Sequence, residues 1–166
     1  MTPEHQLDPD ALGDHVDRLF RAAWALCGSR EDAEDLVQET FARVLTRPRL
    51  VQRDDDIGYL MRVLRNTFIS QQRALGRRPR SAGTAPEELD LADVRSGAQP
   101  AAASEAREVY RAISELPGDF RDALVAIDVA GLSYTEAARA LRVPEGTVTS
   151  RLYRARRQVA RTLGPR

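Results

Sequence analysis

Five arginines crowd into one short segment near the carboxyl end of the chain, VPEGTVTSRLYRARRQVAR (residues 143–161), in which Glu145 is the only acid. A guanidinium group can hold two acceptor atoms at once, on a guanine edge or on a phosphate, and nearby hydroxyls can reach the same groups. Most charge runs, however, are solvated helix faces. The residues before this segment are therefore needed to distinguish a nucleic-acid-binding helix from an ordinary surface helix.

The segment belongs to a longer pattern that is typical of a helix-turn-helix. Ser133 and Glu136 have the spacing of a capping box, which predicts the start of a short helix of small apolar residues. A turn is expected at Arg142, and Pro144 then begins a second helix. Its inner side is expected to carry Val148 and Leu152, and its outer side Thr149, Ser150, Tyr153, Arg154 and Arg157. The first half of such a helix enters a major groove, although a helix-turn-helix can also serve protein contacts alone.

The rest of the chain has helical spacing and no clear strand alternation. Helices are expected from near Pro9, with Asp8 as a cap, to Gly28, from Ser29 as a cap to Pro48, from Ile57 to about Arg73, and as two shorter segments between residues 105 and 131. The apolar stripe of the second helix is expected to run from Leu36 to Leu45.

Two further segments have the composition of a loop or linker between helices. In ALGRRPR, Gly76 and Pro79 predict a loop that carries the arginines. Residues 81–104 are rich in Ala, Gly, Pro, Ser and acids, which is typical of a flexible linker. We therefore expect an all-α fold with two small helical domains, 8–80 and 105–166, joined by that linker.

The 166-residue chain has no net charge, but its 25 basic residues are all arginine and dominate 57–80 and 139–166, which indicates two basic surfaces. Cys27 is the only cysteine, so neither a disulfide nor a cysteine zinc site is expected within the chain. No catalytic set, glycine-rich phosphate loop or cofactor site is recognisable, so we expect no enzyme. The sequence has no membrane-length apolar run and no signal-peptide layout, which predicts a cytoplasmic protein.

Four acids fall within five residues at the start of the second expected helix: Glu31, Asp32, Glu34 and Asp35. Such a cluster could hold a metal ion, but no histidine accompanies it. Acids in a first helical turn are also stabilised by the helix dipole, so we expect no metal there.

Two stretches resemble the sigma-70 family of RNA polymerase sigma factors. SREDAEDLVQETFARVL followed by YLMRVLRNTFISQQRALGRRPR resembles region 2, and ELPGDFRDALVAIDVAGLSYTEAARALRVPEGTVTSRLYRARRQVARTL resembles region 4. Both lie in the family's order with the predicted linker between them, and together they cover nearly the whole chain. A chain with only these two regions resembles the extracytoplasmic-function (ECF) group.

This resemblance implies an initiation subunit that binds core RNA polymerase, recognises the minus-35 and minus-10 promoter elements and helps to melt the DNA. The implied partners are core polymerase, promoter DNA and, as is usual in the family, an anti-sigma factor in the bacterial cytoplasm. Two alternatives stay open. One is a stand-alone helix-turn-helix regulator, and the other is a helical interaction protein that does not touch DNA.

The resemblance also assigns residues to each contact. By this resemblance the residues that contact polymerase are Asp35, Gln38 and Glu39. Those that contact the minus-10 element are Arg65, Asn66, Ser70, Gln72, Arg73, Gly76, Arg77 and Arg78, with Arg80 on a phosphate. Those that contact the minus-35 element are Thr149, Ser150, Arg151, Tyr153 and Arg154, with Arg156 and Arg157 on phosphates.

Three positions depart from the family's pattern. Gln71 stands where an aromatic residue is often found, Thr149 stands where basic residues are common, and Arg142 stands where glycine is frequent and a positive φ is required. The departure at Gln71 concerns how bases are stacked, and those at Thr149 and Arg142 concern the promoter sequence rather than the activity. Asn66 has a second interpretation, as a buried structural amide.

Overall fold

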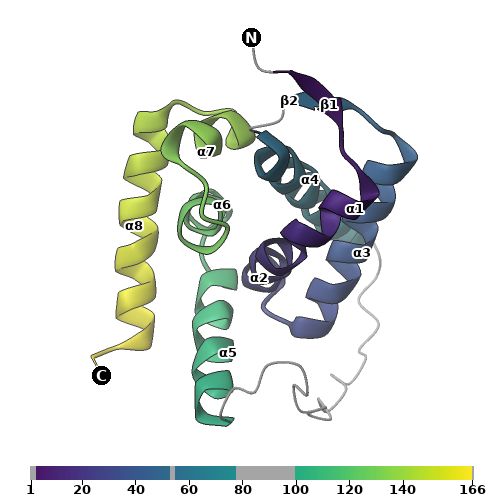
Figure 1. Ribbon diagram of the computed structural model, residues 1–166. Coiled ribbons are helices and arrows are strands. Elements are labelled where there is room, and N and C mark those ends of the chain that lie inside the picture. Colours follow the sequence, from purple (N-terminus) through teal and green to yellow (C-terminus); the bar gives the residue numbers. More distant parts are fainter. Residues whose placement is uncertain (1–2, 53–54, 78–99, 166) are drawn as a thin grey trace.

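The computed structural model describes residues 3–52, 55–77 and 100–165, which are almost wholly helical and form two helical units (Figure 1). The first unit contains β1 (Glu4–Gln6), α1 (Pro9–Leu12), η1 (Gly13–His15), α2 (Val16–Cys27), α3 (Arg30–Thr46), β2 (Leu50–Gln52) and α4 (Asp56–Arg77). The second contains α5 (Pro100–Ser114), α6 (Gly118–Leu124), η3 (Val125–Val129), α7 (Tyr134–Leu141) and α8 (Glu145–Leu163). Most of the predicted linker, 81–104, lies outside the described residues, but α5 begins at Pro100, so a linker reaching 104 was predicted too long.

Local capping sets the helix ends of the first unit, as predicted. Asp8 Oδ1 accepts a hydrogen bond from the Asp10 amide (3.0 Å) at the start of α1, and Ser29 Oγ accepts one from the Asp32 amide (3.4 Å) at the start of α3. Gly28 separates α2 from α3 in the left-handed conformation, with a φ of 74°. The single helix expected from Pro9 is interrupted by the 3-10 turn η1, which begins at a glycine, a poor helix former.

Two features of the first unit differ from the sequence prediction. α4 continues through Gly76 to Arg77, so the end of the helix near Arg73 and the loop expected at Gly76 were wrong; Arg78 and Arg80 lie outside the described residues. β1 and β2 form a two-stranded antiparallel sheet with His5 opposite Val51. Strands of three residues are too short to show a period of two in the sequence.

The helix-turn-helix of the second unit forms as predicted. Ser133 Oγ accepts a hydrogen bond from the Glu136 amide (3.1 Å), and the Glu136 carboxylate accepts one from the Ser133 amide (2.7 Å), which completes the capping box of α7. Arg142 ends α7 with φ 57° and ψ 45°, the positive φ expected from its place in the turn. The π-helical segment η3, which continues α6, was not predicted.

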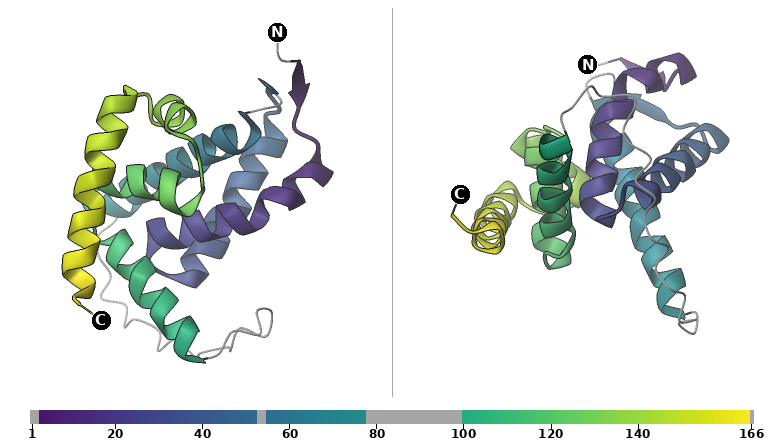
Figure 2. Two further views of the ribbon diagram at one scale, coloured as in Figure 1. Left: turned by 60° about the vertical axis from the view of Figure 1, so that its left-hand side comes forward. Right: turned by 90° about the horizontal axis from the view of Figure 1, so that it is seen from below.

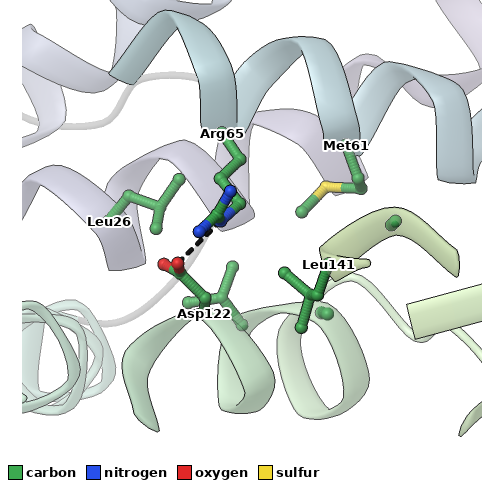
Figure 3. A pocket seen from close by; sticks show the side chains of 8 residues that line it. Leu26, Met61, Arg65, Asp122 and Leu141 are labelled. Atoms are coloured by element: carbon green, nitrogen blue, oxygen red, sulfur yellow. Dashed lines mark hydrogen bonds and ion pairs between the residues drawn. The ribbon is translucent and has the colours of Figure 1, made fainter. Parts of the chain in front are cut away.

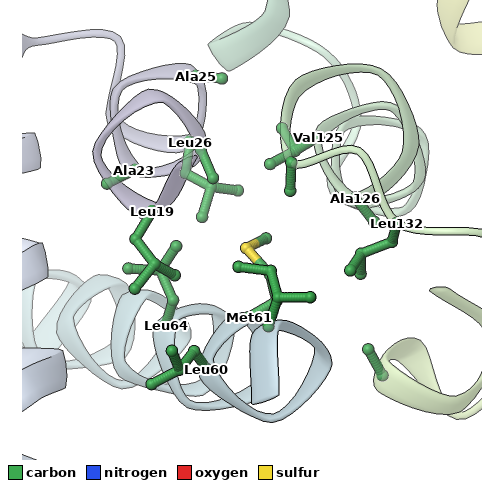
Figure 4. Close-up of a cluster of buried hydrophobic side chains, with 14 of the residues drawn as sticks. Leu19, Ala23, Ala25, Leu26, Leu60, Met61, Leu64, Val125, Ala126 and Leu132 are labelled. Atoms are coloured by element: carbon green, nitrogen blue, oxygen red, sulfur yellow. The ribbon is translucent and has the colours of Figure 1, made fainter. Parts of the chain in front are cut away.

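The two units share one hydrophobic core. α2 packs against α5 and η3, and α4 packs against α7, so the second unit lies along one side of the first (Figures 1 and 2). In Figure 4, Leu26 and Met61 of the first unit and Val125 of the second point into the same space. The sequence pattern predicts the two units but not this contact between them.

Replacing Arg142 by glycine is expected to stabilise the fold. A residue with a Cβ atom costs about 1 kcal/mol or more in the left-handed conformation, and the greater freedom of glycine in the unfolded chain offsets part of the gain. We expect Arg142→Gly to raise the free energy of unfolding by about 0.5 kcal/mol in urea denaturation. Arg142→Ala keeps the Cβ atom and should show no gain; an equal gain in both variants would contradict this account.

Cys27, at the end of α2, is expected to react slowly. Burial raises the pKa of its thiol to about 12; Asp32 adds to the rise and Arg121 opposes it. Because the thiolate is the nucleophile, the raised pKa lowers the rate of alkylation at mildly alkaline pH. Iodoacetamide should label the native protein at least about a hundredfold more slowly than the same chain in guanidinium. Similar rates in the two states would show that Cys27 is not buried as described.

Candidate nucleic-acid interface

The second helix of the helix-turn-helix, α8, has one buried and one exposed face. Val148, Leu152 and Ala155 are fully or almost fully buried against the unit's core. The hydroxyl of Thr135 on α7 bonds the carboxylate of Glu145 at 2.6 Å, which ties the start of α8 to the preceding helix. The residues predicted to face outward do so: Thr149, Ser150, Tyr153, Arg154 and Arg157 are all exposed.

The arginines of α8 are not equivalent. Arg156 makes two hydrogen bonds to the Asp128 carboxylate, at 2.7 and 2.8 Å, and the side-chain hydrogen bond raises the pKa of its guanidinium. Arg151 lies 3.6 Å from Asp119. Arg157 lies over the Tyr153 ring at 5.7 Å. Among the described residues no acidic partner faces Arg154, which leaves its guanidinium fork open to a ligand.

Two hydroxyls on the same face of α8 are turned towards the helix backbone. Thr149 Oγ1 donates to the Glu145 carbonyl oxygen (3.0 Å), and Ser150 Oγ donates to the Thr147 carbonyl oxygen (3.2 Å). Each hydroxyl oxygen therefore keeps its acceptor side for an outside donor. Together with Tyr153 and Arg154, the face offers both donors and acceptors, which suits base edges in a major groove.

A second polar face lies on α4. Asn66, Ser70 and Arg73 are exposed and spaced at i, i+4 and i+7, which places them along one side of the helix. Gln72 and Gly76 are exposed as well, whereas the side chains of Arg77 and Arg78 lie outside the described residues. Asn66 is therefore not a buried structural amide, and that interpretation is wrong.

Arg65 departs from the rest of the predicted minus-10 set. Its Nε donates a hydrogen bond of 2.7 Å to Asp122 Oδ2 on α6, across the contact between the two units (Figure 3). Asp122 is 8% exposed. Helical spacing did not predict that Asp119, Asp122 and Asp128 pair with these arginines. Their place on one short stretch between two basic segments was the feature of the sequence that pointed to such pairing.

The predicted polymerase-binding residues lie on the solvent side of α3. Asp35, Gln38 and Glu39 are exposed, while Leu36 is fully buried. Leu45 is 47% exposed, seven residues beyond Gln38 and so on the same side of the helix. Leu45 is therefore an exposed apolar side chain beside polar residues, although helical spacing placed it on the buried side of the helix.

No cluster of metal-binding side chains is found among the described residues. The four acids at the start of α3 are exposed, and no group of three or more His, Cys, Asp or Glu side chains converges anywhere in the ranges that the structure covers. In the same ranges no helix is both long enough and apolar enough to cross a membrane.

Comparison with known protein families gives two matches that follow the two units. Residues 12–78 match the family described as "Sigma-70 region 2", and residues 106–159 match "Sigma-70, region 4". The first match covers η1 to α4, and the second covers most of α5, the helices that follow it, and α8 up to residue 159.

Curated relatives and solved structures point to the same family. The ECF RNA polymerase sigma factor SigE of Mycolicibacterium smegmatis is 37% identical over 87% of this chain, which spans 57% of that protein. The ECF RNA polymerase sigma factor SigM of Mycobacterium tuberculosis is 36% identical over 90% of this chain and 74% of its own length.

Two solved structures share the fold. The sigma factor RpoE from Bartonella quintana, in complex with the anti-sigma factor NepR, has a TM-score of 0.65, 26% identity, and coverage of 94% of this chain and 98% of that one. CnrH, in complex with the cytosolic domain of CnrY, has a TM-score of 0.62 at 24% identity, over 93% of this chain and 85% of that one. With both regions matched in order and relatives above 30% identity along most of the sequence, the chain belongs to the sigma-70 family of RNA polymerase sigma factors, in its ECF group.

Proposed function

We propose that this chain binds core RNA polymerase and directs it to promoters, reading the minus-35 element with α8 and the minus-10 element with α4. The observation that carries the proposal is the pair of exposed polar faces, Thr149 to Arg157 on α8 and Asn66 to Arg73 on α4, at the positions that match the family's DNA-contacting segments. The chain itself performs no covalent step, and it acts in the bacterial cytoplasm, where the polymerase works.

The two faces suit two forms of DNA. The first half of α8 enters the major groove of duplex DNA, where Arg154 can bond a guanine edge and Arg157 a phosphate. Asn66 and Ser70 on α4 meet a base taken out of the non-template strand, and Arg73 meets the backbone. Extracting a base costs a few kcal/mol of stacking, so a polar face beside a positive charge is what the melted strand needs.

The exposed side of α3 provides the polymerase contact. Asp35, Gln38 and Glu39 offer polar groups, and Leu45 adds an apolar anchor at the same side. The solved relative from Bartonella quintana is bound to an anti-sigma factor. We propose that an anti-sigma factor likewise holds this chain inactive until it is released.

Run-off transcription with core polymerase on a promoter library tests the proposed function. Core polymerase with this chain is expected to initiate at sites that core alone does not use. If no such sites appear, the proposed activity is wrong. Footprinting without polymerase distinguishes the proposed function from that of a stand-alone regulator. A stand-alone regulator would protect a promoter by itself, whereas this chain is expected to need core polymerase.

Arg154→Ala should weaken transcription that depends on the minus-35 element by about tenfold, since a direct base contact is worth about 1–3 kcal/mol. Arg161→Ala is the matched control: Arg161 is an exposed arginine on the same helix, seven residues further from the groove-binding end, and its loss should change transcript levels less than twofold. Equal losses in both variants would show that α8 contributes only general positive charge.

A further inference from the structure

Two arginines of α8 are held by acids of region 4 itself, one on each flank of the helix. The buried stripe of α8 consists of Val148, Leu152 and Ala155, and α8 packs against α6 and α7 (Figure 1). At roughly 100° per residue, Arg156 lies about 70° to one side of this stripe and Arg151 about 70° to the other. These flanks lie between the buried and the exposed face, so an ion pair there limits rotation of the helix about its own axis.

The pair between Arg156 and Asp128 has the closer geometry. Arg156 Nε donates to Asp128 Oδ2 at 2.8 Å, and Nη2 donates to Oδ1 at 2.7 Å, which fills one edge of the guanidinium and both oxygens of the carboxylate. Arg151 Nη2, by contrast, lies 3.6 Å from Asp119 Oδ2. A forked pair of arginine and carboxylate holds a defined geometry even where water reaches it, whereas a single exposed contact contributes little.

The same pair makes Arg156 a poor phosphate contact. The Asp128 carboxylate neutralises the guanidinium charge at hydrogen-bond distance. A phosphate that approached Arg156 would also approach this carboxylate, and the two negative groups repel. Arg154 and Arg157 differ, because neither has an acidic partner in the ranges that the structure describes. The forked pair therefore favours a structural role for Arg156 over the phosphate contact that the family resemblance implies.

A second side-chain bond holds α8 on the same flank. Thr135 Oγ1 of α7 lies 2.6 Å from Oε1 of Glu145, the first residue of α8. Arg156 follows Glu145 by about three helical turns, so the two contacts line one side of the helix about 16 Å apart. One joins α8 to α7 and the other joins it to η3. Together they fix α8 relative to the rest of region 4 at two points.

The reading of a base edge is sensitive to rotation of α8. A helix with its side chains has a radius of about 5–6 Å, so a rotation of about 10° moves a side-chain tip by about 1 Å. Hydrogen bonds to a base edge tolerate a change of only about 0.5 Å. The buried stripe provides the least hold at its end, because Ala155 contributes a single methyl group. Arg156 is the next residue, so its pair with Asp128 acts where the stripe contributes least.

We propose that Arg156 is a positioning residue: paired with Asp128, it sets the rotation of α8 so that Arg154 meets its base in the minus-35 element. Arg156 itself holds no DNA phosphate. The inference rests on the proposed function, because it gives Arg156 a part in the reading of the minus-35 element by α8. Loss of the pair misaligns the base contact but keeps the positive charge of the outward face, so it lowers specificity rather than general affinity for DNA.

Binding of the holoenzyme to two promoters tests this role. Core polymerase with the full chain is titrated with a promoter found by run-off transcription and with the same promoter altered in its minus-35 element, and the ratio of the two affinities is measured. Asp128→Asn should lower this ratio at least about fivefold, because a base contact is worth a factor of that order. If Arg156 held a phosphate, loss of the competing carboxylate would instead strengthen binding to both promoters alike.

Arg156→Lys is a second variant, in case Asp128→Asn does not fold. Lysine keeps the positive charge, which is enough for a phosphate, but it cannot form the fork, so the ratio should fall as in Asp128→Asn. Glu115→Gln is the matched control. It also removes an acid paired with an arginine of region 4, Arg111 at 3.4 Å, and should keep the wild-type ratio. Loss of folded protein lowers binding to both promoters equally, so the ratio separates positioning from stability.

The salt dependence of binding gives an independent measurement. The double variant Asp128→Ala, Arg156→Ala removes the pair without changing the net charge. The slope of log affinity against log salt concentration should equal that of wild type, whereas loss of one phosphate contact would reduce its magnitude by about 0.9. A reduced slope would overturn the proposal.

Two further results would overturn it as well: a wild-type ratio in folded Asp128→Asn or Arg156→Lys, and an equal fall of the ratio in Glu115→Gln. Failure of the proposed function is a different result. In that case the wild-type holoenzyme initiates at no promoter or does not distinguish the intact minus-35 element from the altered one. Failure of the positioning role alone leaves this distinction intact in the wild type and in the variants of the pair.

Discussion

The ion pair between Arg65 and Asp122 is the contact on which the arrangement of the two regions depends. Burying a carboxylate costs several kcal/mol unless a cation and hydrogen bonds compensate for the lost water. Here the compensation comes mainly from the other region, at 2.7 Å. A substitution of either partner would leave the other charge in the interface without its closest counter-charge.

The apolar residues beside the pair are part of the hydrophobic core that the two regions share. Small side chains, Ala126 and Ala140, let the helices of region 4 come near Leu26 and Met61. Gly28 contributes in the same way, because a Cβ atom there would lie 2.5 Å from Ser114 Oγ at the end of α5. The contact between the regions therefore combines apolar packing with an ion pair.

Most of the local structure could be predicted from the sequence, because its signals are themselves local. The caps at Asp8 and Ser29, the capping box at Ser133 and the positive φ at Arg142 each depend on residues within one turn of each other. The exposed faces of α3, α4 and α8 follow from helical period. The side-chain roles on those faces come from family resemblance, because periodicity places a residue outward without saying what it binds.

The contact between the regions could not be predicted in the same way. The sequence separation between Arg65 and Asp122 is 57 residues, and that between Arg18 and Ala130 is 112, so no local pattern connects them. The β1–β2 sheet could not be predicted for the same reason, because its strands are short and far apart in the sequence. The exposure of Leu45 was missed because a helical stripe says which residues share a face but not how far the neighbouring helices cover it.

The acids of region 4 are distributed unevenly among the arginines of the two regions. The chain has 25 basic and 25 acidic residues, yet the acids of α6 and η3 lie where they neutralise Arg65, Arg151 and Arg156, and none lies against Arg154. Both Arg151 and Arg156 are held by acids of their own region. Arg65 alone of these three is held across the interface. Among these three pairs, the contact between the regions therefore neutralises charge on α4 rather than on α8.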